Sequence, residues 1–135
     1  MRSEPIVIID DDMEDLELFR DIVIEMRFPH PIITFNNSLK ALDYLRTAIT
    51  HPAFILCDIN MPKLDGFQLR AELLKTNTSV NDVPFLFLST SKLDTEITHA
   101  NELKAYAYYT KPNSIEDIKQ IFQSIMKLLN INGAK

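Results

Sequence analysis

Five short apolar runs recur along the chain, separated by longer segments that carry apolar residues at helical spacing. The runs occupy residues 6–9, 32–35, 54–57, 85–88 and 106–109. Most of them lack polar alternation, which is typical of strands covered on both faces of a parallel sheet. Parallel strands are joined by crossover helices, and these crossovers are right-handed. The pattern therefore predicts an α/β fold, a doubly wound five-stranded parallel sheet with a helix after each strand.

The segments between the runs predict five helices, of which the last is the clearest and the fourth the weakest. In the last segment, apolar residues recur every three or four positions from Ile115 to Leu129. The fourth segment is polar on most sides. Side chains that can accept hydrogen bonds from free N–H groups mark four helix starts. These candidate caps are Ser38, Asp65, Ser91 or Asp94, and Ser114.

Length and composition fit one domain spanning residues 1–135, with residues 132–135 as a flexible tail. The net charge of −5 disfavours direct nucleic-acid binding, which requires Lys and Arg to neutralise phosphates. The single cysteine, Cys57, excludes an intramolecular disulfide. The apolar runs are too short for a membrane span. The first run is also too short for the apolar region of a secretory signal, because three aspartates follow it directly. We therefore expect a cytoplasmic protein that does not contact a membrane.

Polar residues follow four of the five runs. Aspartates at positions 10–12 follow the first run, Asp58 the third, Ser89 the fourth, and Thr110 and Lys111 the fifth. Ligands of open α/β sheets bind beyond the carboxyl ends of the strands. We expect the first and third strands to be neighbours, so that at least three carboxylates meet there. Carboxylates at such short distances repel one another unless one of them holds a proton or a cation neutralises them. Mg²⁺ is a suitable cation because it prefers carboxylate, water and phosphate oxygens.

A carboxylate nucleophile, a metal, a lysine and a hydroxyl group together predict a site for phosphoryl transfer. Each residue also has a simpler interpretation. Asp58 alone could be a turn residue, Ser89 part of an ordinary loop, and Tyr108 a strand aromatic. The shared location of these side chains at the strand ends favours the functional interpretation.

Four segments resemble the receiver domain of two-component response regulators. They read IVIIDDD, FILCDINMPKLDGFQL, FLFLSTS and YYTKP, and the similarity covers nearly the whole chain in the family's order and spacing. One such segment would be a weak signal, whereas four at the ends of four strands are specific. The resemblance implies a flavodoxin-like (βα)5 fold with strand order 2-1-3-4-5, of the single-domain, chemotaxis-regulator-like kind.

The resemblance implies a role for each member of the acidic group. Asp58 matches the family's phosphoacceptor. Asp10 and Asp11 match its acidic pair, with Asp11 the more direct ligand of Mg²⁺ and Asp10 often acting through water. Asn60 would bind the same ion through its backbone carbonyl, and Asp58 would be a further ligand.

The remaining positions match the family's phosphate contacts and switch. Lys111 would contact a phosphoryl oxygen, with a cis peptide between Lys111 and Pro112. Ser89 matches the hydroxyl that turns towards the phosphoryl group, and Tyr108 the aromatic residue that moves with it. Lys104 stands where the family often has glycine. A left-handed helix end costs a non-glycine residue roughly 1 kcal/mol, so we expect this helix to end differently.

The favoured function is a phosphorylation-activated response regulator in a two-component phosphorelay. A sensor histidine kinase or a phosphotransfer protein would supply the phosphoryl group. The 135 residues carry no separate output domain, so the expected output is an unknown downstream protein, a further relay step, or a homodimer. The face for such contacts would be formed by the fourth helix, fifth strand and fifth helix.

Two alternatives come from other classes. The first is a metal-dependent phosphatase or phosphotransferase that passes through an aspartyl phosphate. Such enzymes usually carry a second acid two residues after the nucleophile, where this chain has Asn60, so we expect a protein that catalyses only its own phosphorylation and dephosphorylation. The second is an interaction domain that ignores phosphate, which the intact set of site residues disfavours.

Overall fold

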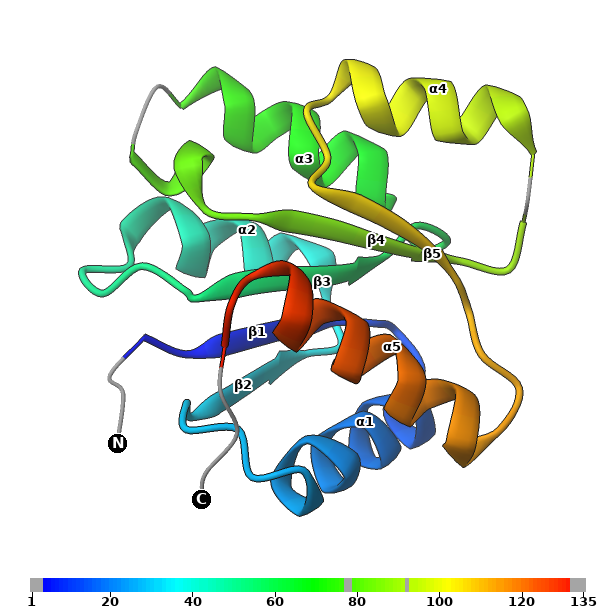
Figure 1. Cartoon of the computed structure of the whole chain (residues 1–135). Coiled ribbons are helices and arrows are strands. Elements are labelled where there is room, and N and C mark those ends of the chain that lie inside the picture. Colours follow the sequence, from blue (N-terminus) through cyan, green and yellow to red (C-terminus); the bar gives the residue numbers. More distant parts are fainter. Residues whose placement is uncertain (1–3, 77–78, 92, 132–135) are drawn as a thin grey trace.

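The computed structural model describes residues 4–76, 79–91 and 93–131, so the predicted tail at 132–135 lies outside the described residues. Strands and helices alternate along the chain (Figure 1). The strands are β1 (Ile6–Ile9), β2 (Ile32–Phe35), β3 (Phe54–Asp58), β4 (Phe85–Ser89) and β5 (Ala107–Thr110). The helices are α1 (Met13–Glu25), α2 (Ser38–Thr47), α3 (Gly66–Lys75), α4 (Asp94–Glu102) and α5 (Ile115–Leu128), with a short 3-10 helix, η1 (Ser79–Asp82), before β4.

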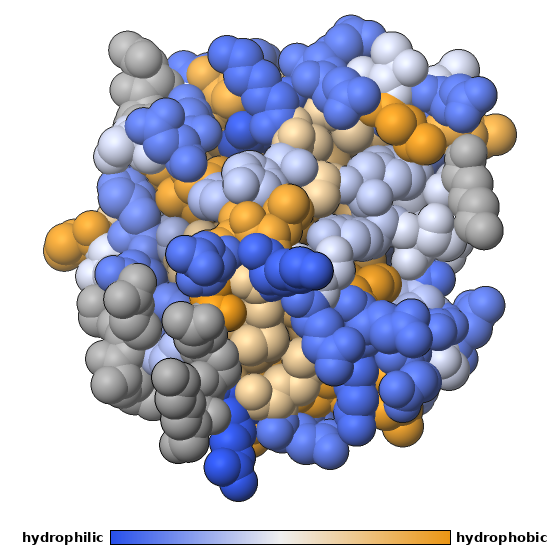
Figure 2. Space-filling view, in the orientation of Figure 1, coloured by the Kyte–Doolittle hydropathy of each residue, from blue (hydrophilic) through white to orange (hydrophobic). Residues whose placement is uncertain are grey.

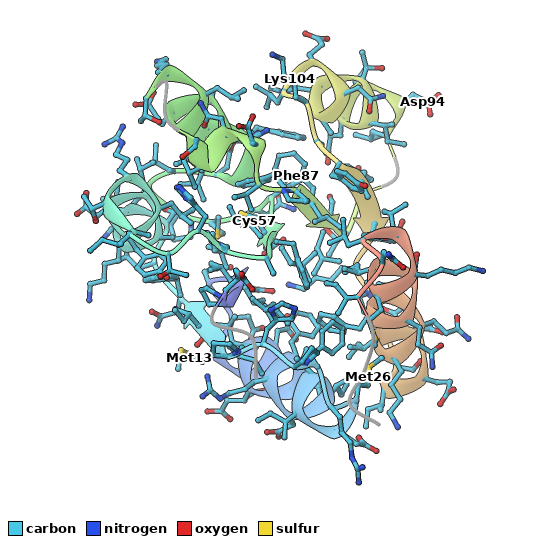
Figure 3. All side chains as sticks on the ribbon, turned by 60° about the vertical axis from the view of Figure 1, so that its left-hand side comes forward. Met13, Met26, Cys57, Phe87, Asp94 and Lys104 are labelled. Atoms are coloured by element: carbon cyan, nitrogen blue, oxygen red, sulfur yellow. The ribbon has the colours of Figure 1, made fainter. Side chains whose placement is uncertain are left out.

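The five strands form one parallel sheet in the order β2-β1-β3-β4-β5, which confirms the predicted fold and strand order. Helices α1 and α5 cover one face, and α2, α3 and α4 lie on the other (Figure 1). Each face has its own apolar core. Cys57 and Phe87 belong to the core beneath α2 and α3, and their side chains lie inside the molecule in Figure 3.

Burial explains why the strands read as continuous apolar runs. Every residue of β1, β3 and β4 is buried, because helices cover both faces of these central strands. The edge strands β2 and β5 are half-buried over most of their length. No helix within the described ranges is long and apolar enough to cross a membrane.

The helix starts follow the sequence prediction at two positions and depart from it at two others. Asp65 caps α3 in a reciprocal capping box with Gln68, and Ser114 accepts from the Asp117 N–H at the start of α5, as predicted. Asn37, not Ser38, caps α2. Asparagine caps as well as serine does, and its position one residue earlier lets its side-chain oxygen accept from the backbone N–H groups of residues 39 and 40.

The prediction that Ser91 or Asp94 caps α4 was wrong, because the capping position belongs to Leu93. The apolar side chain of Leu93 cannot accept a hydrogen bond. Ser91 lies two residues before that position, and its Oγ accepts from the Leu93 N–H at 3.2 Å. Helix α4 therefore starts without side-chain capping of its first turn.

The end of α4 also differs from the prediction. Lys104 adopts the left-handed conformation, with φ of 61°, where a different termination was expected. The N–H of Lys104 donates to the Asn101 carbonyl and the N–H of Ala105 to that of Ala100, which is the Schellman pattern. The buried Arg70 reinforces this end by donating from Nε to the Leu103 carbonyl at 3.0 Å. These bonds offset the strain of a non-glycine residue. Figure 3 labels Asp94, where α4 begins, and Lys104, which follows the end of α4.

Candidate functional site

An acidic cluster forms where β1 and β3 end. The two strands are neighbours, with Ile9 paired to Cys57, so Asp10 and Asp58 emerge side by side. Asp10, Asp11 and Asp58 each offer a carboxylate oxygen, and these oxygens lie within 4.8 Å of one another. Asp10 and Asp58 are buried, with 0% and 5% of their surface exposed, whereas Asp11 is exposed. The structure thus brings together the three carboxylates that the sequence singled out.

Burial makes these charges costly. It raises the pKa of Asp58 to about 6, and the neighbouring charge of Asp10 adds to the effect although Lys111 opposes it. Burial also raises the pKa of Asp10 above its ordinary value. A divalent cation with a preference for oxygen ligands would remove the repulsion between the carboxylates. The three carboxylates therefore fit a hard metal ion, and Asp11 is the exposed member of the set.

Lys111 lies among the carboxylates at the end of β5. Its Nζ is 2.8 Å from Asp10 Oδ2, 2.8 Å from Asp15 Oδ2 and 3.5 Å from Asp58 Oδ2. Burial alone would lower the pKa of Lys111, but hydrogen bonds to Asp10 and Asp15 outweigh it and hold the pKa above its usual range. The ammonium group is thus fixed as a cation beside Asp58.

The peptide bond before Pro112 is trans, as are the other bonds of the described residues, so the prediction of a cis peptide was wrong. The trans isomer is intrinsically favoured before proline by about 0.5–1 kcal/mol. With this isomer Lys111 still donates its backbone N–H to the Ser89 carbonyl at 2.6 Å and still reaches the acidic cluster.

Asp15 is a member of the site that the sequence did not reveal. An acid in the first turn of a helix, as Asp15 is in α1, ordinarily complements the helix dipole. The structure shows that its carboxylate also contacts Lys111. The available signal was its position in the first turn of α1, the helix that starts directly after the acidic residues at the end of β1.

The two predicted switch residues lie on adjacent strands and share a partner. Ser89 ends β4 and is fully buried, and its Oγ donates to Glu96 Oε1 at 3.1 Å. Tyr108 lies on β5 opposite Phe87, and its hydroxyl is 3.0 Å from the same Glu96 oxygen and 3.0 Å from the Ser91 carbonyl. Glu96 had no motif that could have identified it.

The loop from β3 to α3 is held close to Asp58. The backbone N–H of Asn60 donates to the Asp58 carboxylate, while the side chain of Asn60 is exposed. A side chain at Gly66 would place its Cβ 2.6 Å from the Asp58 carbonyl oxygen, so only glycine permits this approach of α3. Ser38 Oγ donates to the Pro62 carbonyl at 3.3 Å and accepts from the Leu64 N–H, which fixes the loop from the side of α2.

The family model of the response regulator receiver domain matches residues 6–123. The chain belongs to the response regulator receiver family. It is 27% identical over 125 residues to response regulator Rcp1 of Synechocystis sp., covering 89% of this chain and 84% of that protein. Receiver domains of this kind interact with histidine kinases or with phosphotransfer proteins.

Solved receivers share the fold of this chain. The phosphorylated cyanobacterial phytochrome response regulator RcpA superposes with a TM-score of 0.84 at 28% identity, over 96% of this chain and 95% of that one. The Mn(2+)-bound form of Rcp1 gives a TM-score of 0.80 at 25% identity, over 98% and 99% of the two chains.

In this receiver a groove opens beside the acidic cluster. Its volume is about 480 Å³, and it lies between the first turns of α1 and the segment that joins β5 to α5. Its lining includes the charged Asp15 and Lys111 and the apolar Ile115 and Ile118. The groove therefore gives solvent access to Asp15 and Lys111 beside a partly apolar wall.

Proposed function

We propose that this receiver is a phosphorylation-activated switch in which Asp58 accepts a phosphoryl group from a histidine kinase or a phosphotransfer protein. The observation that carries the proposal is the convergence of three carboxylates and Lys111 at the ends of β1, β3 and β5. The cluster is acidic and largely buried: burial raises the pKa of Asp58 to about 6, and the charge of Asp10 adds to this effect. It is suited to a cation and to the oxygens of a phosphoryl group.

Mg²⁺ is the ion that this donor set would hold. Its ligands would be the carboxylates of Asp10, Asp11 and Asp58 and the backbone carbonyl of Asn60, with Asp10 acting through water. Mg²⁺ accepts carboxylate, carbonyl, water and phosphate oxygens together, and when bound it would neutralise the incoming phosphoryl oxygens. The Mn(2+)-bound form of the similar regulator Rcp1 supports a divalent ion here.

The chemistry of Asp58 follows from its ionisation. At neutral pH a carboxyl group with a pKa of about 6 is mainly ionised and can attack phosphorus. A new O–P bond forms while the P–N bond of the donor phosphohistidine breaks, the electron pair of that bond stays on the histidine nitrogen, and the imidazole becomes neutral by taking a proton from solvent. Lys111, 3.5 Å from Asp58, would then contact a phosphoryl oxygen.

The readout would pass through Ser89 and Tyr108 to the α4-β5-α5 face. Apolar side chains interrupt the polar surface on this side of the molecule (Figure 2). Those that are exposed include Ile97, Ile115 and Leu128 on the helices, Leu93 just before α4 and Tyr106 just before β5. Such a face suits a downstream protein or a second copy of the chain. The proposal places the receiver in the cytoplasm, where a kinase domain has access to ATP.

A metal-dependent phosphatase acting through Asp58 is the alternative, and stoichiometry distinguishes the two. With Mg²⁺ and a small phosphodonor such as acetyl phosphate, we expect at most about one phosphoryl group per chain, because the chain catalyses only its own modification. The same preparation should not turn over p-nitrophenyl phosphate. Repeated turnover of that ester, lost in Asp58→Asn, would instead establish the enzyme alternative.

A further inference from the structure

One carboxylate oxygen of Glu96 accepts hydrogen bonds from both switch residues. Glu96 Oε1 lies 3.1 Å from Ser89 Oγ and 3.0 Å from the Tyr108 hydroxyl. Glu96 is half-buried in the first turn of α4, Ser89 is fully buried at the end of β4, and Tyr108 is half-buried on β5. A single side chain of α4 therefore joins the two strands that carry the predicted switch.

The hydroxyl hydrogen of Ser89 can serve only one acceptor at a time. A serine hydroxyl has one hydrogen to donate, and Ser89 gives it to Glu96. The Ser89 oxygen meanwhile accepts from the Ser91 N–H at 3.0 Å. Ser89 can therefore donate to a phosphoryl oxygen only after it leaves Glu96.

Tyr108 is less dependent on Glu96. Its one hydroxyl hydrogen has two acceptors at 3.0 Å, the Glu96 carboxylate and the Ser91 carbonyl, and the hydroxyl also contacts the Ser89 side chain. Without the carboxylate, the carbonyl still accepts from Tyr108. Loss of Glu96 would therefore release Ser89 while the ring of Tyr108 keeps a partner.

We propose that Glu96 is a positioning residue that holds the Ser89 hydroxyl away from the phosphoacceptor and thereby opposes the phosphorylated state. The inference rests on the proposed function, in which Asp58 carries the phosphoryl group. The phosphoryl oxygens and Glu96 are both charged acceptors, and they compete for the same hydrogen. When Ser89 turns to the phosphoryl group, Glu96 loses one of its two donors, and this change reaches the first turn of α4.

Binding of beryllium fluoride with Mg²⁺, a mimic of the phosphoryl group, tests this competition by calorimetry. Wild type should bind it at Asp58, and Asp58→Asn should not. Glu96→Ala should bind it about tenfold more tightly, the order expected for a hydrogen bond to a charged acceptor. Glu96→Gln keeps an acceptor oxygen without the charge, so its affinity should lie between the two.

Charge repulsion alone could also tighten binding when Glu96 is removed, and two controls separate it from the hydrogen bond. Glu102→Ala removes an exposed carboxylate from the same helix and should leave the affinity unchanged. In a Ser89→Ala background, Glu96→Ala should have no effect, because there is no hydroxyl to release. An undiminished effect in that background, or a wild-type affinity in Glu96→Ala, overturns the inference. If wild type binds no beryllium fluoride, the proposed function fails and this inference fails with it.

A second measurement needs no phosphoryl mimic. Urea unfolding without added Mg²⁺ measures the free energy of unfolding of each variant. The Ser89→Ala, Glu96→Ala double variant should lose less of this free energy than the sum of the losses in the two single variants, because both substitutions remove the same hydrogen bond. Additive losses would show that the two side chains are not coupled and would overturn the inference. Glu96→Gln provides the comparison if Glu96→Ala does not fold.

Discussion

Asp58 combines deep burial with a charge that the metal-free chain does not fully neutralise. Only 5% of its surface is exposed, and the carboxylate of Asp10 lies beside it. The pKa of about 6 means that the folded chain binds this proton more tightly than the unfolded chain, in which the value is near 3.8. The ionised form of Asp58 is thus unfavourable, and a bound cation would relieve this cost.

Replacing Asp58 by Asn should stabilise the metal-free protein near neutral pH. The shift of about two pKa units sets an upper limit of roughly 3 kcal/mol on the free energy recovered, and we expect about 1–3 kcal/mol. The cost of ionising Asp58 is absent below about pH 4, grows as the pH rises to about 6 and is complete above it. Urea unfolding at pH 5 and pH 8 measures the difference.

The stabilisation by Asp58→Asn should therefore be larger at pH 8 than at pH 5. Asp12→Asn is a matched control, because Asp12 is an exposed acid next to the cluster. It should give no such gain at either pH. A variant at position 58 that is less stable than wild type at pH 8 would show that Lys111 more than compensates the buried charge.

At this scale the predicted strand ends placed the acidic residues, Ser89 and Lys111 together, and the family resemblance added Tyr108; their roles remain predictions. The sequence did not reveal Asp15 or Glu96. Both are acids in the first turn of a helix, where the ordinary role of an acid is to complement the helix dipole. Their second role depends on how α1 and α4 are oriented on the sheet, and residue spacing does not specify this.

At the scale of elements, α4 has the fewest buried residues of the five α-helices. Ala100 is the one buried residue of this fully described element. Its first turn lacks a side-chain cap, and its end requires a left-handed Lys104. The sequence predicted the polar surface of α4, since its apolar residues are sparse. It could not predict its termination, because the bonds from Arg70 come from a distant helix.

Replacing Lys104 by Gly should stabilise the protein by about 1 kcal/mol, because glycine adopts the left-handed conformation without a Cβ clash. Lys104→Ala is the control, since it keeps the Cβ and should give no comparable gain. Thermal or urea unfolding of the two variants provides the measurement. Equal stabilities would contradict the argument from backbone strain.

Strand positions were predicted to within one residue, because buried parallel strands are continuously apolar. Helix starts were less predictable. Ser38 and Asn37 are adjacent and both can act as caps, and the choice between them leaves Ser38 free to bind the β3–α3 loop. This loop contact is tertiary and has no local signal.

At the scale of the whole molecule, the order of the strands brings the residues of the candidate site together. Residues 10, 58, 89 and 111 are far apart in the sequence, and the parallel sheet brings them to one edge. The alternation of strands and helices predicts this convergence once neighbouring strands are assigned. Stability of the fold and occupancy of the site should therefore be linked.

Mg²⁺ should stabilise the folded chain, because the unfolded chain lacks the assembled site. Ligand at about one hundred times its dissociation constant adds roughly 2.7 kcal/mol. Asp11→Asn should lose most of this increment, whereas Glu14→Gln, which alters an exposed acid of α1 outside the cluster, should retain it. Urea unfolding with Mg²⁺ and with EDTA gives the comparison, and a wild-type midpoint unaffected by Mg²⁺ would contradict the metal site.

Intact mass after treatment with acetyl phosphate tests the central claim most directly. Wild type with Mg²⁺ should gain the mass of one phosphoryl group, and the gain should be absent in EDTA and in Asp58→Asn. Asp12→Asn should behave as wild type. A wild type that gains no mass with any small phosphodonor, or an Asp58→Asn variant that gains as much as wild type, would contradict the account.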